Sequence, residues 1–156
     1  MEDAPKTTRD RLVKLETSIR IGGVLRKNAV IPDALFGRRF NEDEESYFML
    51  EIDRGEMPVE RYKNAQRTYF AKKMMTYYEA NRQQRHVHDL GIPNFRVLTM
   101  TTTPERVERM LAALDAITEG RGSNMFLFAD QAAFMASNPL ELEWVSGKRE
   151  RVRLTD

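Results

Sequence analysis

Two apolar stretches of the chain, residues 29–36 and 47–55, carry acidic side chains where the core of a β-sheet normally holds none. The first stretch contains Asp33, and the second contains Glu51 and Asp53. An ionised carboxylate inside an apolar strand costs free energy unless a cation or hydrogen-bond donors compensate it. A polar connection of hairpin length separates the two stretches. Because an antiparallel hairpin would gather these carboxylates at one end of a small sheet, we expect the chain to build a site there.

The rest of the chain alternates between segments of helical and of strand-like periodicity. Leu12, Leu15 and Ile19 recur at helical spacing, so we predict a short amphipathic helix over residues 9–20. Further along the chain we predict an extended segment over 24–36, a strand over 47–53, a long helix over 59–85, a strand over 95–100, a helix capped by Thr103 that ends before Gly120, a strand over 125–128, a short helix over 131–136, and a closing hairpin of 141–145 with 151–154.

This order of elements indicates an α/β fold with a mixed sheet flanked by helices. A length of 156 residues is sufficient for one hydrophobic core, so we predict a single domain over residues 1–156. Its core would span about residues 24–130, and residues 131–156 would form a carboxy-terminal extension.

The composition excludes several classes of site and partner. The sequence has no cysteine, which rules out disulfides and thiolate metal sites and fits a cytoplasmic protein. It contains neither a segment apolar enough to span a membrane nor an amino-terminal signal peptide. The net charge is only +1, so any electrostatic argument for nucleic acid depends on where the charges lie.

The carboxylates of the two apolar stretches suit a divalent cation. Mg²⁺ prefers oxygen ligands, commonly one or two carboxylates with water and phosphate oxygens. Asp33 and Glu51 would hold such an ion beside a phosphodiester, and Asp53 lies on the same strand face as Glu51. A cation is also needed to orient the attacking water, and Lys63 is the best-placed lysine, with Arg54 and Arg61 as substitutes.

These motifs resemble those of known DNA-processing proteins. Residues 31–33 (Ile-Pro-Asp) followed by residues 50–53 (Leu-Glu-Ile-Asp) resemble the PD-(D/E)xK nuclease fold. More narrowly, residues 25–128 resemble the carboxy-terminal half of the plasmid replication–relaxation family, most specifically in the Glu-Ile-Asp-Arg-Gly segment of residues 51–55. The resemblance implies a three-layer nuclease-like core in a DNA-processing protein of a plasmid, phage or other mobile element. Members usually carry a winged-helix domain before this region, and this chain is too short to contain one.

The resemblance also implies roles for particular side chains. Asp33, Glu51 and Asp53 would bind Mg²⁺ or Mn²⁺, and Lys63 would complete a catalytic set for hydrolysis of DNA. Standard PD-(D/E)xK enzymes have a lysine where Asp53 stands, so activity would depend on Lys63. The alternative is a catalytically degenerate module that binds DNA or a replication or relaxase protein.

The predicted long helix concentrates positive charge that could follow a phosphate backbone. The proposed DNA-binding residues are Arg61, Arg67, Lys72, Lys73, Arg82 and Arg85.

Several simpler interpretations of the same residues remain open. The basic face of the long helix could be an ordinary solvated surface. Asp33 could cap a turn, and Glu51 and Asp53 could form ion pairs with Arg54 or with a basic helix residue. His86 and His88 would form an ordinary surface pair, because no third metal ligand lies near them in the sequence. A small regulator that binds only another protein is a further alternative.

Overall fold

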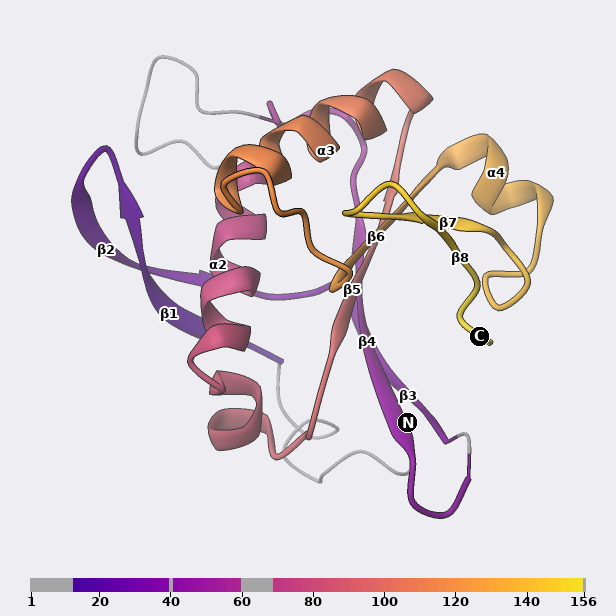
Figure 1. The fold of residues 1–156 in the computed structure, drawn as a ribbon, viewed down its shortest axis with the longest axis horizontal. Helices are drawn as coiled ribbons and strands as arrows, with labels where there is room; N and C mark the ends of the chain where they lie inside the picture. The colour runs from indigo at the N-terminus through magenta and orange to yellow at the C-terminus, as the bar shows by residue number, and fades with distance from the viewer. Residues whose placement is uncertain (1–12, 40, 60–68, 156) are drawn as a thin grey trace. The chain divides into compact units, whose positions relative to one another are not determined.

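The computed structural model, whose ribbon Figure 1 shows, divides the chain into two compact units. It describes residues 13–39, 41–59 and 69–155. The first unit comprises Met1–Leu50 and Lys73–Arg96, and the second comprises Glu51–Lys72 and Val97–Asp156. Among the predicted site residues, Arg61, Lys63 and Arg67 lie outside the described residues, so their roles stay predictions.

The first unit opens with a two-stranded antiparallel ribbon, strands β1 (Leu15–Ile21) and β2 (Val24–Val30). The predicted helix over residues 9–20 is therefore wrong in its described part. Alternate residues of β1 from Leu15 to Ile21 are buried, which is the two-residue period of a strand. Gly22 and Gly23 have φ of 57° and 79°, the conformation that a two-residue hairpin turn requires at both central positions.

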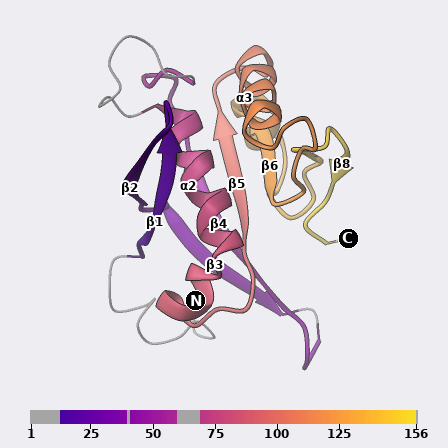
Figure 2. The same ribbon diagram turned by 60° about the vertical axis from the view of Figure 1, so that its left-hand side comes forward.

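The ribbon packs on helix α2 (Phe70–Arg82) through the part of the helix that belongs to the first unit (Figure 2). The Thr17 hydroxyl donates to the Gln83 side-chain oxygen at 2.9 Å just beyond the end of α2, and the Asn28 amide donates to the Thr76 hydroxyl at 2.7 Å. Of the long helix predicted over residues 59–85, the structure shows α2 from Phe70 to Arg82, and the described residues Val59 and Tyr69 before it are not helical.

The predicted hairpin of the two acid-bearing stretches forms as strands β3 (Ala34–Arg39) and β4 (Glu45–Ile52). The two strands are antiparallel, with Ala34 opposite Leu50. Residues 31–33 separate β2 from β3, so the single extended segment predicted over 24–36 is two strands. After α2, a π-helical turn, η1 (His86–Leu90), leads to Gly91, which adopts the left-handed conformation with φ of 69°.

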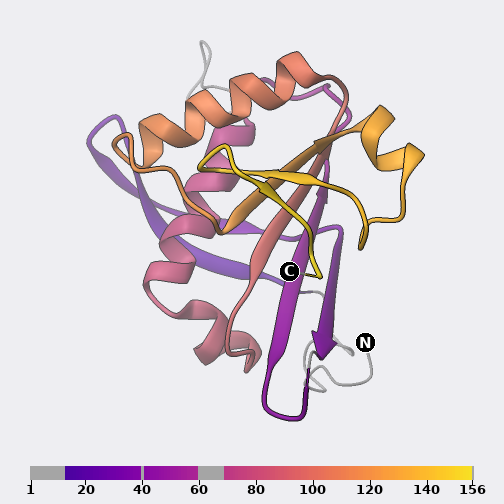
Figure 3. The same cartoon turned by 45° about the vertical axis from the view of Figure 1, so that its right-hand side comes forward.

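The second unit contains the remaining strands and helices (Figure 3). They are β5 (Arg96–Thr101), α3 (Pro104–Ile117), β6 (Phe126–Asp130), α4 (Gln131–Ala136), β7 (Trp144–Ser146) and β8 (Arg151–Val152). In the sheet of this unit the strands β5, β6, β7 and β8 follow one another in that order. It is mixed, because β5 and β6 are parallel while β6–β7 and β7–β8 are antiparallel. The predicted α/β class, a mixed sheet flanked by helices, is confirmed.

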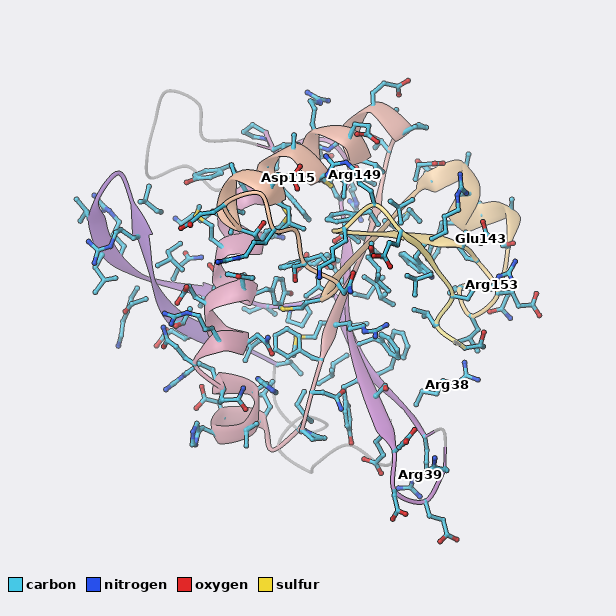
Figure 4. All side chains as sticks on the ribbon, viewed as in Figure 1. Arg38, Arg39, Asp115, Glu143, Arg149 and Arg153 are labelled. Atoms are coloured by element: carbon cyan, nitrogen blue, oxygen red, sulfur yellow. The ribbon has the colours of Figure 1, made fainter. Side chains whose placement is uncertain are left out.

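Local signals place the elements of the second unit correctly. The Thr103 hydroxyl accepts from the backbone N–H of Arg106 at 3.2 Å, so the predicted cap of α3 is confirmed. The predicted closing hairpin also forms, although β7 and β8 are shorter than expected. An ion pair between Asp115 of α3 and Arg149 of the β7–β8 turn, 2.8 Å apart, ties the hairpin to the helix (Figure 4). Within the described ranges, no helix is long and apolar enough to cross a membrane.

Candidate functional site

The acidic residues of β4 lie on the buried face of the strand. Tyr47, Met49 and Glu51 alternate on this face and are at most 3% exposed, and Asp53 continues the pattern just beyond the strand. Ile52, on the opposite face, is 43% exposed although it is apolar. These carboxylates therefore lie in the interior, where the free-energy cost of burying a charge has to be offset by an ion pair or hydrogen bonds.

Asp53 finds its partners within the second unit. Arg106 of α3 donates from Nε to Asp53 Oδ2 at 2.5 Å and from Nη2 to Asp53 Oδ1 at 3.0 Å. The Thr101 hydroxyl at the end of β5 donates to Asp53 Oδ2 at 2.6 Å. Arg106 also donates to the backbone carbonyl of Met57. We call Asp53, Thr101, Arg106 and the Met57 carbonyl the Asp53 cluster.

The Asp53 cluster satisfies both oxygens of the carboxylate with a two-point contact from a guanidinium, the strongest geometry for such a pair. Both side chains are nearly fully buried, at 6% exposure for Arg106 and 5% for Asp53. An ion bound by Asp53 would have to displace this guanidinium. Asp53 therefore forms an ion pair with a basic residue of a helix, which was one of the simpler interpretations of the sequence. The basic residue is Arg106.

Sequence reasoning missed both partners of Asp53. Arg106 is 53 residues away, and Thr101 lies two residues before the predicted cap Thr103 without a predicted role of its own. The backbone N–H of Asp53 donates to the Met100 carbonyl at 2.8 Å, which sets the end of β4 beside the end of β5. That pairing, invisible in the linear pattern, brings the carboxylate to the amino-terminal turn of α3.

The other two predicted metal ligands lie in different units. Glu51, in the second unit, is 2% exposed. Asp33, in the first unit, is exposed, and its backbone N–H donates to the Leu50 carbonyl at 2.9 Å. Among the described residues, no group of three or more histidine or acidic side chains is arranged to hold a metal ion. The predicted metal site therefore stays a prediction.

Two of the arginines predicted to contact DNA form ion pairs with acids close to them in the sequence. Arg82 pairs with Glu79 at 2.8 Å, and Arg85 pairs with Asp89 at 3.0 Å. The guanidinium of Arg82 lowers the pKa of the Glu79 carboxyl, so this acid is ionised and offsets the arginine at neutral pH. Lys72 and Lys73, the two described lysines of the predicted set, are half-buried.

A second basic surface, missed by the sequence reasoning, lies on the β1–β2 ribbon. Four cations lie on or next to it, and Glu16 is the one acid within its strands. These cations are Lys14, Arg20, Arg26 and Lys27. Glu16 contacts the two lysines at 3.5 Å and 3.9 Å, whereas no ion pair to either arginine occurs in the described part of the chain. The signal that could have revealed it was the Gly-Gly pair that follows the alternating segment of residues 15–21.

His86 is not the surface residue that the sequence suggested. It is 2% exposed, and its ring meets Phe95 edge-on with 5.0 Å between centroids. Its Nδ1 atom is buried and has no hydrogen-bond partner among the described residues. Burial lowers the pKa of His86 below its usual 6.5, and a hydrogen bond with the Pro93 backbone opposes this effect. His88, two residues away, is exposed.

We expect the stability of the protein to fall as the pH drops below about 6.5, because the unfolded chain then takes up a proton that buried His86 resists. Above the unfolded-state pKa of about 6.5 the histidine is neutral in both states, and His86 costs no stability. The loss of stability grows as the pH falls from there to the lower pKa of the folded state. Urea unfolding at about pH 7.5 and about pH 5.5, where carboxylates still titrate little, measures the difference. His86→Phe should reduce the difference, whereas His88→Gln should preserve it; equal behaviour of the two variants would contradict the assignment.

No family model, curated protein or solved structure matches this chain in comparisons with known proteins. The resemblance to the plasmid replication–relaxation family and to nucleases stays a prediction.

Proposed function

We propose that this protein is a DNA-binding module of a plasmid, phage or other mobile element, built on a catalytically degenerate nuclease-like fold. The observation that carries the proposal is the basic β1–β2 ribbon. Its cations outnumber its acids four to one, and its residues from Val24 to Lys27 are all exposed. DNA binding at physiological salt comes largely from such clusters of lysine and arginine, which neutralise phosphates.

The shape of the ribbon also suits DNA. The major groove of B-DNA admits a two-stranded β-ribbon, whose side chains can reach the base edges. At the tip of the ribbon, Val24 is 51% exposed and Leu25 is 60% exposed, although both are apolar. Apolar groups at a tip flanked by cations can contact thymine methyl groups while the cations contact phosphates. The ribbon therefore supports backbone contacts with limited base readout.

The Asp53 cluster supports the degenerate form of the fold. A lysine at position 53, where the resembling enzymes have one, would place its ammonium beside the guanidinium of Arg106. Like charges in a buried site are strongly unfavourable. Position 53, where the resembling enzymes have the catalytic lysine, instead holds an aspartate that pairs with Arg106 and links α3 to the end of β4.

Reversing two charges on the ribbon should weaken DNA binding strongly. We expect Arg26→Glu with Lys27→Glu to lower the affinity and to reduce the slope of log K against log salt concentration by about two, because two phosphate contacts are lost. Fluorescence anisotropy with a labelled duplex over a salt series measures both quantities.

The matched control is Arg121→Glu with Lys148→Glu, which makes the same charge change at exposed sites of the second unit. This control should bind DNA almost as the unmodified protein does. If it weakens binding as much as the ribbon variant, the attraction is a property of total charge, and the ribbon is not the binding surface.

The second candidate, a metal-dependent endonuclease, is favoured by the burial of Glu51. The Glu51 carboxylate is 2% exposed, and buried carboxylates are frequent at catalytic sites. Asp33 and Glu51 have the oxygen donors that Mg²⁺ or Mn²⁺ prefers, but Asp53 does not fit as a ligand, because Arg106 and Thr101 occupy its oxygens.

Incubation of supercoiled plasmid with the protein and Mg²⁺ or Mn²⁺ distinguishes the two candidates. The DNA-binding module leaves the plasmid supercoiled at concentrations that shift its mobility. Nicking that is lost in both Asp33→Ala and Glu51→Gln would establish the endonuclease instead. Nicking that survives both substitutions would show that these carboxylates are not the site.

A further inference from the structure

A cavity of about 250 Å³ lies in the second unit, between the first turns of α3, the end of β6, α4 and β7. Its inner wall is apolar and includes Val107, Phe128 and Ala133. Val107 and Phe128 are buried, so this wall belongs to the core of the unit. Its rim carries three acids, Glu108, Asp130 and Glu143, and one arginine, Arg151. The cavity does not include any residue of the ribbon or of the predicted metal site.

The charges of the rim are unevenly satisfied. Glu143 forms ion pairs with two arginines, with Arg151 at 3.3 Å and with Arg153 at 3.4 Å. Figure 4 labels Glu143 and Arg153. Asp130 uses Oδ1 to accept from the backbone N–H of Ala133 at 3.0 Å, which caps α4. Glu108 is exposed and forms no ion pair with any described residue. Two carboxylates of the rim, on Glu108 and Asp130, thus form no ion pair with any described residue, because Arg151 pairs with Glu143.

The size and chemistry of the cavity select one kind of occupant. A volume of 250 Å³ is below the range of about 300–1,000 Å³ that small-molecule sites usually occupy, so it suits a group the size of one side chain. The apolar wall favours an aliphatic stem, and the carboxylates of the rim favour a positive head. Lysine and arginine combine both properties, because they bury an apolar stem and keep the charge at the surface.

We propose that this cavity receives a lysine or arginine side chain of a protein partner. The stem would lie against Val107 and Phe128, and the cationic head would meet Glu108 and Asp130. The residues of the partner on either side of this side chain would add contacts with the rim. A free amine of the same size makes no such contacts. The site is independent of DNA binding and gives the module a separate contact for a protein.

Titration of the ¹⁵N-labelled full chain with short peptides tests the cavity directly. The probes are Ac-Gly-Arg-Gly-amide, the same peptide with citrulline in place of arginine, and agmatine as a free cation. We expect the arginine peptide to shift the backbone amide signals of Val107, Ala129 and Ala133 and to bind about tenfold more tightly than the citrulline peptide, since a charge-assisted hydrogen bond is lost. Agmatine should bind more weakly than the arginine peptide.

Variants of the rim and wall separate charge from space. Glu108→Gln with Asp130→Asn should weaken the arginine peptide by about tenfold or more while keeping the cap of α4, because asparagine caps as well as aspartate. Ala133→Leu should block binding by filling the cavity. The matched control, Glu119→Gln with Glu150→Gln, removes two exposed acids outside the cavity and should bind normally.

Three results would overturn the proposal. Equal binding of the citrulline and arginine peptides would show that the cavity does not recognise charge. Agmatine binding as tightly as the peptide would mean that a free amine, not a protein partner, is the occupant. Absence of amide shifts around the cavity with every probe, in a protein whose spectrum shows it to be folded, would mean that no cation binds there.

Discussion

Asp53→Ala is expected to lower the free energy of unfolding by about 3–5 kcal/mol, because it leaves the buried guanidinium of Arg106 without its counter-charge. The loss would also release Thr101 and weaken the hold of α3 on the end of β4. Urea unfolding followed by circular dichroism measures the change.

The matched control for this prediction is an exposed ion pair. Glu143→Ala removes the acid shared by Arg151 and Arg153 and should cost less than about 1 kcal/mol, since exposed pairs contribute little. The double variant Asp53→Leu with Arg106→Met should recover most of the stability, because apolar side chains of similar size often replace a buried pair without loss. Equal effects of Asp53→Ala and Glu143→Ala would refute the role of the Asp53 cluster.

Trp144→Ala should lower the free energy of unfolding by about 3–5 kcal/mol, because it empties a large, fully buried site. The indole ring of Trp144 packs edge-on against the ring of Phe134 in α4, with 6.1 Å between the ring centroids. Its Nε1 donates a hydrogen bond to the Pro139 carbonyl at 3.0 Å. The substitution therefore also loosens the wall that α4 contributes to the cavity. Thermal and urea unfolding report the loss of stability.

Two variants show which part of Trp144 matters. Trp144→Phe keeps most of the apolar volume and removes only the hydrogen bond to Pro139, so it should cost clearly less than the alanine variant. Leu140→Ala removes an apolar side chain that is 36% exposed and should have a small effect. A Trp144→Ala variant as stable as Leu140→Ala would mean that α4 does not depend on this contact.

Residues that are close in the sequence were predicted well. Thr103 caps the helix three residues ahead of Arg106, and the β3–β4 hairpin joins two strands across a short polar connection. Strand β1 was harder, because Leu15 and Ile19 fit a helical period as well as a strand period. In the structure β1 pairs with β2 along its whole length, and Thr17 forms a side-chain hydrogen bond with Gln83, which is far away in the sequence.

The acid-bearing strand shows how far the sequence alone reaches. The sequence by itself determined that Glu51 of β4 and Asp53 just beyond it would lie on one face, because the strand period places alternate residues together. Only the tertiary structure decided that this face is buried and that Asp53 meets Arg106, which is 53 residues away. An ion pair depends on distances between side chains of separate elements, and no local pattern specifies those distances. The packing of α3 against the end of β4 therefore decides what the carboxylate of Asp53 contacts.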